Sequence, residues 1–339
     1  MDERTALIDS FLQRAGWGGA ERRALAADAS FRSYDRVRHK GRAAVLMNAP
    51  PPRENVTAFH RVQEILLSLG FSAPEAIAMD AANGLLLLED FGDKTFTKAL
   101  AAGAAEQPLY QMATELLQAL HQRCSEGAAD LEPYDASALE REVLLLPEWY
   151  YPAVVGRPAS GQQIADYLAA WRGLWPAALA VPETLVLRDY HVDNLMVLGD
   201  RPGISACGLL DFQDALRGPI SYDLASLLQD ARRDVPRDIE ASMIAQYLAA
   251  FPELDRAAFK ASYSVLAAQR SAKIIGIFTR LSRRDRKDDY LKHVPRVWRL
   301  LENALTQEVL APVGAWFAKE LPVPLRLTPP PLCAEKDGA

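Results

Sequence analysis

The sequence is poor in cysteine, with three in 339 residues. Cys124, Cys207 and Cys333 lie far apart and show none of the paired spacings that bind zinc. Their odd number also argues against a complete set of disulfides. We therefore expect free thiols in a reducing compartment rather than a disulfide-stabilised secreted scaffold.

Long apolar runs are also missing. The run from Leu85 to Leu88 is far shorter than the ~18 residues that a membrane-spanning helix needs. The N-terminus begins with Asp2, Glu3 and Arg4 and continues in an amphipathic pattern, without the basic start and unbroken apolar stretch of a signal peptide. The sequence thus predicts a cytoplasmic protein with no membrane partner.

An excess of positive charge is absent as well, because the formal net charge is -6. One basic stretch, residues 280–299, is interrupted by Asp285, Asp288 and Asp289. This balance disfavours a nucleic-acid partner. With half of its residues apolar, the chain can bury a core by itself, and we expect a monomer with a small-molecule substrate.

The apolar spacing that is present predicts an α+β chain with two lobes. Residues 1–91 form a small, strand-rich N-lobe that covers a nucleotide. Within it the spacing predicts a short helix over 2–15, strand-like segments from about residue 22, and one longer helix near 54–69. Residues 92–325 form a larger C-lobe with a strand-rich interruption at 185–211 and helical periods near 106–122, 137–150, 161–180, 236–250, 254–281 and 296–309. Residues 326–339 are predicted to be a partly mobile tail.

The strongest chemical signal is a polar loop, residues 188–194, between two apolar strand-like segments. Asp189 and Asn194 are five residues apart in this loop, the spacing of the catalytic loop of protein kinases. Transfer of a phosphoryl group to a hydroxyl needs a carboxylate near the attacking oxygen and oxygen ligands for Mg²⁺, and such a loop supplies both. Leu187 stands where that motif has histidine.

A second signal follows where the apolar segment 208–210 ends in Asp211 and Phe212, with Asp211 placed 22 residues after Asp189. A metal-binding aspartate at a strand end, after a loop with base and asparagine, is the arrangement of the D-F-G motif, although Gln213 replaces its glycine. Taken separately, each motif is more typical of a turn. Their order and their place inside a helical lobe favour the catalytic interpretation.

Three segments together resemble the aminoglycoside phosphotransferase and choline kinase superfamily. They are Arg188-Asp-Tyr-His-Val-Asp-Asn194, Leu209-Leu-Asp-Phe-Gln213 and Arg217-Gly-Pro-Ile-Ser-Tyr-Asp-Leu-Ala225. His191 belongs to the pattern that distinguishes this group from protein kinases. The resemblance covers most of the chain and implies a protein-kinase-like bilobal fold.

The resemblance implies a role for each matching residue. Asp189 is the expected catalytic base, and Asn194 and Asp211 are the expected Mg²⁺ ligands, with ATP as phosphoryl donor. Asp223 matches an aspartate that is structural in the family. His191 either ties the loop by hydrogen bonds or has a direct role.

The N-lobe departs from the family pattern in two places. The segment 28–33 stands where a glycine-rich phosphate loop is expected, and we expect Ser30, Phe31 and Arg32 to contact the nucleotide. Met47 occupies the place of the strand lysine that pairs with ATP phosphates. Either an arginine takes over or metal and backbone contacts suffice; the candidate arginines are Arg32, Arg36 and Arg38.

An apolar strand-like segment ends at Glu89, Asp90 and Phe91, just before the predicted lobe boundary. This position fits the connection between lobes where adenine hydrogen-bonds to the backbone. We therefore assign these three residues to nucleotide binding.

Within the superfamily, the chain is similar to the anomeric kinases of N-acetylmuramate and N-acetylglucosamine, which act in peptidoglycan recycling. The similarity lies in residues 28–32, which lack a following strand lysine, and in residues 146–150 and 269–281. Glu148 and Trp149 are candidate substrate residues, and Trp149 either stacks on a sugar or belongs to the core. Arg270 and Lys273 lie inside an apolar helical period and could pair with a carboxylate of the sugar.

Two other functions stay open from the sequence alone. An aminoglycoside or choline-type kinase would need an anionic or aromatic cation-binding pocket. A kinase-shaped binding protein without activity is suggested by the missing lysine, but disfavoured because Asp189, Asn194 and Asp211 are all present.

Overall fold

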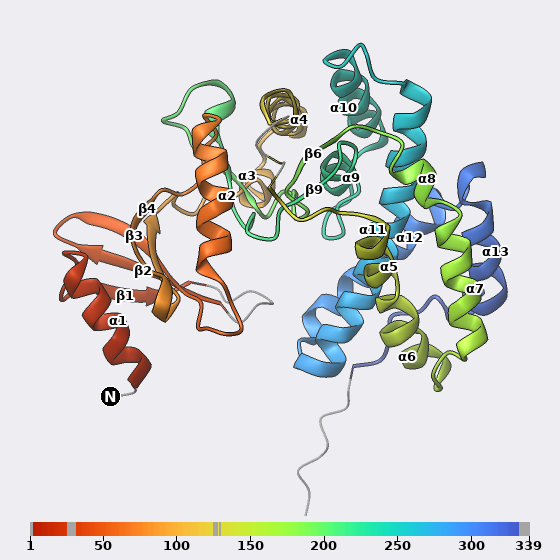
Figure 1. The fold of residues 1–339 in the computed structure, drawn as a ribbon, viewed down its shortest axis with the longest axis horizontal. Coiled ribbons are helices and arrows are strands. Elements are labelled where there is room, and N and C mark those ends of the chain that lie inside the picture. Colours follow the sequence, from red (N-terminus) through yellow and green to blue (C-terminus); the bar gives the residue numbers. More distant parts are fainter. Residues whose placement is uncertain (1–2, 26–31, 125–127, 129, 332–339) are drawn as a thin grey trace, which may run out of the picture. The chain divides into compact units, whose positions relative to one another are not determined.

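The structure, a computed structural model, describes residues 3–25, 32–124, 128 and 130–331. It divides into two compact units (Figure 1). The first comprises Met1–Leu116 and Val192–Ala215, and the second comprises Leu117–His191 and Leu216–Ala339. This division concerns compactness alone, so the lobe boundaries given above stay predictions.

The first unit is built on a five-stranded antiparallel sheet in the order β1-β2-β3-β5-β4. Its strands are β1 (Glu21–Ala24), β2 (Ser33–His39), β3 (Arg42–Asn48), β4 (Ala76–Asp80) and β5 (Leu85–Glu89). Lys40 and Gly41, both with positive φ, turn β2 into β3. A second hairpin pairs β4 with β5, and the two hairpins confirm the strand-rich character predicted for this part of the chain.

Strand alternation gives this sheet two different faces. The helix α1 (Glu3–Arg14) covers one face, and its apolar side chains pack in one cluster with Val37, Ala44, Leu46, Leu85 and Leu87. The neighbours of these residues along the strands point to the opposite face. There Val45 and Leu88 line a cavity together with Phe59 of helix α2 (Val56–Ser68), so one face is core and the other faces the candidate site.

A second, smaller sheet completes the first unit. It consists of β7 (Leu195–Val197) and β8 (Cys207–Leu209), joined through the short helix η3 (Gly203–Ala206). Isolated bridges from Thr95 to Met196 and from Ser72 to Gly208 tie this hairpin to neighbouring segments. The unit also contains η1 (Ala81–Asn83), α3 (Phe96–Ala101) and the start of α4 (Glu106–Arg123).

The second unit is mainly helical and is organised around α11 (Arg256–Asp285). Its two strands, β6 (Glu183–Val186) and β9 (Leu216–Pro219), pair antiparallel. Helices α5 (Ala136–Val143), η2 (Leu146–Tyr150), α8 (Trp175–Ala178), α9 (Tyr222–Leu228), η4 (Asp288–His293) and α12 (Val294–Ala304) pack against α11. The others are α6 (Tyr151–Val155), α7 (Gly161–Arg172), α10 (Arg237–Ala249), η5 (Glu308–Leu310), α13 (Ala311–Glu320) and η6 (Val323–Leu325). In the part of the chain that the structure describes, no helix combines the length and apolar character needed to cross a bilayer.

The predicted helix over 137–150 is instead two elements, α5 and the π-helix η2. Pro147 lacks an amide N–H and weakens a continuous α-helix at this point. The π-helix lies against α11 at Gly276, where a Cβ atom would come within 2.3 Å of the Leu145 carbonyl carbon. Glycine is required there because any side chain would collide with backbone.

His121 provides a pH-dependent contribution to stability. Its imidazole is buried, Nδ1 lies 2.6 Å from the Tyr247 hydroxyl, and burial lowers the pKa of His121 to about 3. The unfolded chain binds a proton near pH 6.5 that the folded chain excludes. The free energy of unfolding should therefore fall as the pH drops from 6.5 towards 3, by up to about 1.4 kcal/mol per pH unit from this residue.

Denaturant unfolding at pH 7 and pH 5 tests this expectation. The variant His121→Gln should show a smaller difference between the two pH values than wild type. His60→Gln, at a histidine whose side chain is 29% exposed, is the control and should keep the wild-type difference. An equal pH difference in wild type and His121→Gln would contradict the expectation.

Candidate active site

The β7–β8 hairpin brings Asn194 and Asp211 together. The strand register pairs Leu195 with Leu209, and the Leu210 N–H donates to the Asn194 carbonyl oxygen at 2.9 Å. Asn194 and Asp211 thus leave the same end of the hairpin, and both line one cavity. Two oxygen-bearing side chains at this position can serve a hard cation such as Mg²⁺.

That cavity has a volume of about 240 Å³ and belongs entirely to the first unit. Residues 88–92 form one side of it. The rest of its apolar lining comes from strands, from α2 and from the residues just after β8, and includes Val45, Phe59, Met196, Leu210 and Phe212. A flat ring can lie between such side chains, beside the Asn194–Asp211 pair.

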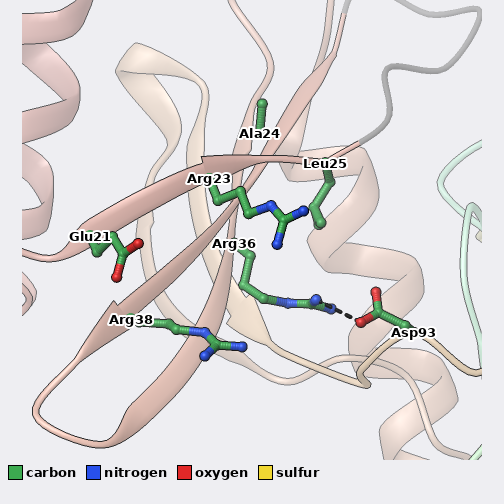
Figure 2. Close-up of a pocket in the computed structure, with 7 residues that line it drawn as sticks. All are labelled: Glu21, Arg23, Ala24, Leu25, Arg36, Arg38 and Asp93. Carbon is green, nitrogen blue, oxygen red and sulfur yellow. Dashed lines mark hydrogen bonds and ion pairs between the residues drawn. The ribbon is translucent and has the colours of Figure 1, made fainter.

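Arg36 holds the segment 90–93 in place. Its guanidinium contacts the Asp90 carboxylate through Nε at 2.7 Å and the Asp93 carboxylate through Nη1 at 2.9 Å, and Nη2 donates to the Gly92 carbonyl at 3.0 Å. Figure 2 shows Arg36 extending from β2 to Asp93. Hydrogen bonds to Asp93 and Asp90 raise the pKa of Arg36 further. Arg36 therefore stays charged and is paired with this segment.

The predicted nucleotide residues Glu89, Asp90 and Phe91 all line the cavity. The Glu89 N–H already donates to the Glu75 carbonyl at 2.9 Å, so a ligand would use other backbone groups here. Ser30 and Phe31 lie outside the described residues. Arg32 is described, is only 8% exposed, and lies 3.3 Å from Asp211 through Nη2.

Asp211 has an unusual backbone, with φ of 56°. A non-glycine residue in this left-handed region costs about 1–3 kcal/mol, and such residues concentrate at functional sites. Arg188, which directly precedes Asp189, also has a positive φ, of 69°. Two of the motif positions predicted from the sequence are thus associated with backbone strain.

In the second unit, Asp223 on α9 holds the loop that carries Asp189. Its carboxylate accepts the N–H of Leu187 at 2.6 Å and that of Arg188 at 2.9 Å. The Ser226 hydroxyl donates to the Arg188 carbonyl at 3.2 Å. Burial raises the pKa of Asp223 to about 7, against the opposing effect of the two N–H donors. These contacts hold Arg188 in its strained conformation and so fix the position of Asp189.

The charges around Asp189 favour its ionised form. Burial raises the pKa of this carboxyl group, but nearby groups outweigh it and leave the pKa below its usual value; in order of effect they are Lys273, His191, Arg270 and Arg188. An ionised carboxylate at neutral pH is able to accept a proton. His191 is buried beside it, with Nε2 at 3.2 Å from Nη1 of Arg232.

Glu142 on α5 is the centre of a buried network in the same unit. Its carboxylate accepts hydrogen bonds from Arg188 at 2.5 Å, Lys273 at 2.7 Å and Gln269 at 2.9 Å, and another from the Tyr134 hydroxyl. Burial raises the pKa of Glu142, but Lys273 and Arg188 lower it to about 2. Glu142 therefore stays charged and holds two cations beside the Asp189 loop.

The four predicted substrate residues lie in different surroundings. Lys273 is engaged with Glu142, whereas Arg270, one helical turn earlier on α11, is 4% exposed. Among the described residues, Arg270 forms neither a hydrogen bond nor an ion pair. Glu148 is exposed and Trp149 is half-buried on η2.

Solved structures of kinase-like phosphotransferases share this fold. A choline/ethanolamine kinase family protein from Mesorhizobium loti superposes with a TM-score of 0.63 at 15% identity, covering 92% of this chain and 98% of that one. An aminoglycoside-3'-phosphotransferase of type VIII gives a TM-score of 0.54 at 15% identity, covering 78% and 98%. The predicted protein-kinase-like α+β fold is confirmed.

Residues 21–259 match the phosphotransferase enzyme family, and the chain belongs to this family. Among its relatives, the N-acetylmuramate/N-acetylglucosamine kinase of Caulobacter vibrioides is 35% identical, covering 96% of this chain and 98% of that one. The kinase of the same name from Pseudomonas aeruginosa is 36% identical, covering 89% and 90%. The resemblance stated from the sequence motifs is therefore confirmed, including its branch.

Sequence patterns gave no indication of Glu142 or of Glu54, which lies 3.7 Å from Arg32. In the sequence, both residues look like ordinary solvent-exposed carboxylates. Glu142 meets Lys273 across 131 residues of sequence, a separation that no local pattern encodes.

Proposed function

We propose that this protein transfers the γ-phosphoryl group of ATP to the anomeric hydroxyl of N-acetylmuramate or N-acetylglucosamine. The relatives, at about 35% identity over nearly their full length, support the choice of acceptor. The observation that carries the chemistry is the Asp189 loop, which Asp223 holds in place through the N–H groups of Leu187 and Arg188. Burial raises the pKa of Asp189, but Lys273 and the other neighbouring charges lower it below its usual value, which favours the carboxylate form. We assign the activity to peptidoglycan recycling in the cytoplasm, by a monomeric enzyme.

In this proposal Asp189 accepts the proton of the anomeric hydroxyl while the oxygen of that hydroxyl bonds to the γ-phosphorus of ATP. The bond to the β–γ bridging oxygen breaks, and the products are the sugar 1-phosphate and ADP. Positioning of Asp189 by Asp223 lowers the entropic part of the barrier.

Asn194 and Asp211 are the proposed Mg²⁺ ligands. One amide and one carboxylate suit this ion, which usually keeps several waters and binds through few protein groups together with substrate phosphates. Bound there, Mg²⁺ neutralises negative charge on the nucleotide phosphates. The base of the nucleotide is assigned to the cavity lined by Glu89, Asp90 and Phe91.

A direct test measures ATP consumption with N-acetylmuramate, N-acetylglucosamine, kanamycin and choline in parallel. The expected result is turnover with the two sugars and loss of their reducing end, because phosphorylation at the anomeric carbon blocks it. Turnover with kanamycin or choline alone would replace the sugar assignment by the aminoglycoside or choline alternative. No turnover with any acceptor would favour the inactive binding protein.

Arg270 is the proposed partner of the carboxylate that distinguishes N-acetylmuramate from N-acetylglucosamine. Lys273 already pairs with Glu142, while Arg270 forms no ion pair among the described residues. A hydrogen-bonded charge pair contributes about 1.5–3 kcal/mol. Arg270→Met should therefore lower the ratio of kcat/KM for N-acetylmuramate to kcat/KM for N-acetylglucosamine about 10- to 150-fold.

The ratio should fall because N-acetylmuramate alone loses a contact. Arg284→Met is the matched control, since Arg284 is an exposed residue of the same helix that pairs with Asp285. An unchanged ratio in Arg270→Met would remove the carboxylate argument and leave the phosphotransferase assignment intact.

A further inference from the structure

Strand β3 has no lysine to offer to a nucleotide. Met47 is 1% exposed and pairs with Tyr34 on one side and Leu86 on the other. Nucleotide phosphates nevertheless require positive charge from the protein or the metal. Arg32, Arg36 and Arg38 are the candidate cations of the first unit for this charge.

The arginines of β2 are poorly suited to this task. Arg36 is held by Asp90, Asp93 and the Gly92 carbonyl, so its donors are already engaged. Arg38 is exposed and lies two residues further along the strand. It lines a neighbouring hollow (Figure 2), which shares Leu25 and Arg36 with the cavity but includes neither Asn194 nor Asp211. Neither residue contacts Asp211 in the contacts described for this unit.

Arg32, directly before β2, is placed differently. It is only 8% exposed, its Nη2 lies 3.3 Å from Oδ1 of Asp211, and its Nε lies 3.7 Å from Oε2 of Glu54. Its guanidinium therefore presents one edge to Glu54 and the other to the end of the β7–β8 hairpin. A guanidinium can contact the two carboxylates through separate nitrogens, whereas all donors of a lysine lie on one nitrogen.

Glu54 has a fixed position of its own. It precedes Asn55, the N-cap of α2, whose side chain accepts the N–H groups of Thr57 at 2.9 Å and Ala58 at 3.4 Å. A carboxylate at the start of a capped helix can orient an arginine and keep its own position when a ligand binds. Glu54 and Arg32 thus form a pair that joins the start of α2 to the proposed metal ligand Asp211.

We propose that Arg32, oriented by Glu54, is the phosphate-binding cation that replaces the strand lysine, and that it exchanges Asp211 for nucleotide phosphate when ATP binds. The inference rests on the proposed function, because it takes ATP as the ligand and Asp211 as a metal ligand. Asp211 then serves the metal, and the edge of Arg32 that carries Nη2 contacts phosphate in its place. Guanidinium groups bind phosphate oxygens through two parallel hydrogen bonds, which suits this edge.

The test compares binding of ATP, ADP and adenosine to the whole protein by calorimetry, with Mg²⁺ and without sugar. Arg32→Met should weaken ATP and ADP binding about 10- to 150-fold, the value of a charged hydrogen-bonded contact, and leave adenosine binding unchanged. Glu54→Gln should weaken ATP binding in the same direction but less. Arg14→Met removes an exposed arginine of the same unit, paired with Asp80, and should change none of the three affinities.

Two results would overturn the inference. One is ATP binding in Arg32→Met that equals wild type. The other is an equal loss for ATP and adenosine, which would mean that Arg32 maintains the cavity rather than binding phosphate. Because no acceptor is present, a wrong sugar assignment leaves these measurements unaffected, and the two hypotheses fail separately.

Discussion

Replacing Asp189 with asparagine is expected to lower turnover about 10²- to 10⁴-fold, the usual contribution of a positioned acid–base group. The amide has nearly the same shape as the carboxylate but cannot take the proton of an attacking hydroxyl. The affinity for ATP should stay near that of wild type, since the cavity assigned to the nucleotide is lined by other residues. Steady-state kinetics and nucleotide binding measured on the same preparation check both statements.

The control for this variant lies four residues along the same segment. The Asp193 carboxylate accepts a hydrogen bond from the Thr97 hydroxyl, and we assign it no part in the chemistry. Asp193→Asn should keep most of the turnover. If Asp189→Asn retained more than about a tenth of wild-type turnover, Asp189 could not be the base.

Removing the Glu142 carboxylate is expected to destabilise the second unit strongly. Glu142→Ala leaves Lys273 and Arg188, which it binds at 2.7 Å and 2.5 Å, without their shared counter-charge. Breaking a buried ion pair from one side costs about 3–5 kcal/mol. Chemical denaturation should show this loss in the free energy of unfolding.

Glu140 offers a matched comparison on the same helix. It pairs at 2.9 Å with Arg172, whose side chain is 58% exposed, and such surface pairs contribute about 0–1 kcal/mol. Glu140→Ala should therefore cost far less than Glu142→Ala. Equal losses in the two variants would show that the Glu142 network contributes no more than a surface pair.

The Glu142 network should also make the free energy of unfolding depend on pH in the acid range. Because the pKa of Glu142 is lowered to about 2 in the folded chain, its contribution is complete above its unfolded pKa near 4.5 and is lost as the pH falls towards 2. In Glu142→Gln this part of the acid sensitivity should disappear.

Local patterns in the sequence were sufficient to predict most elements, and they singled out the motif residues as candidates. Asp189, Asn194 and Asp211 could be found because strand-forming residues flank them and their spacing reflects one loop and one hairpin. The β9 strand, at residues 216–219, and the break between α5 and η2 could not be found in this way. The strand depends on a distant partner, β6, and Gly276 of α11 leaves room for the π-helix. Pro147 is a local signal for the break, but it does not specify a π-helix.

The predicted substrate residues show a similar limit. Helical period placed Arg270 and Lys273 on an inward face of α11, and both are buried. The sequence could not separate their roles, because Glu142 neutralises one of them from a helix 131 residues away.

The division of the chain has a practical consequence for anyone who wishes to dissect the protein into parts. The backbone leaves the second unit after His191, three residues before Asn194, and returns to it at Leu216. A fragment ending at Leu116 would contain all five strands of the large sheet, yet lack both proposed magnesium ligands. Separate expression of the first unit therefore requires residues 192–215 to be joined to residues 1–116, and a simple C-terminal truncation cannot yield this unit complete.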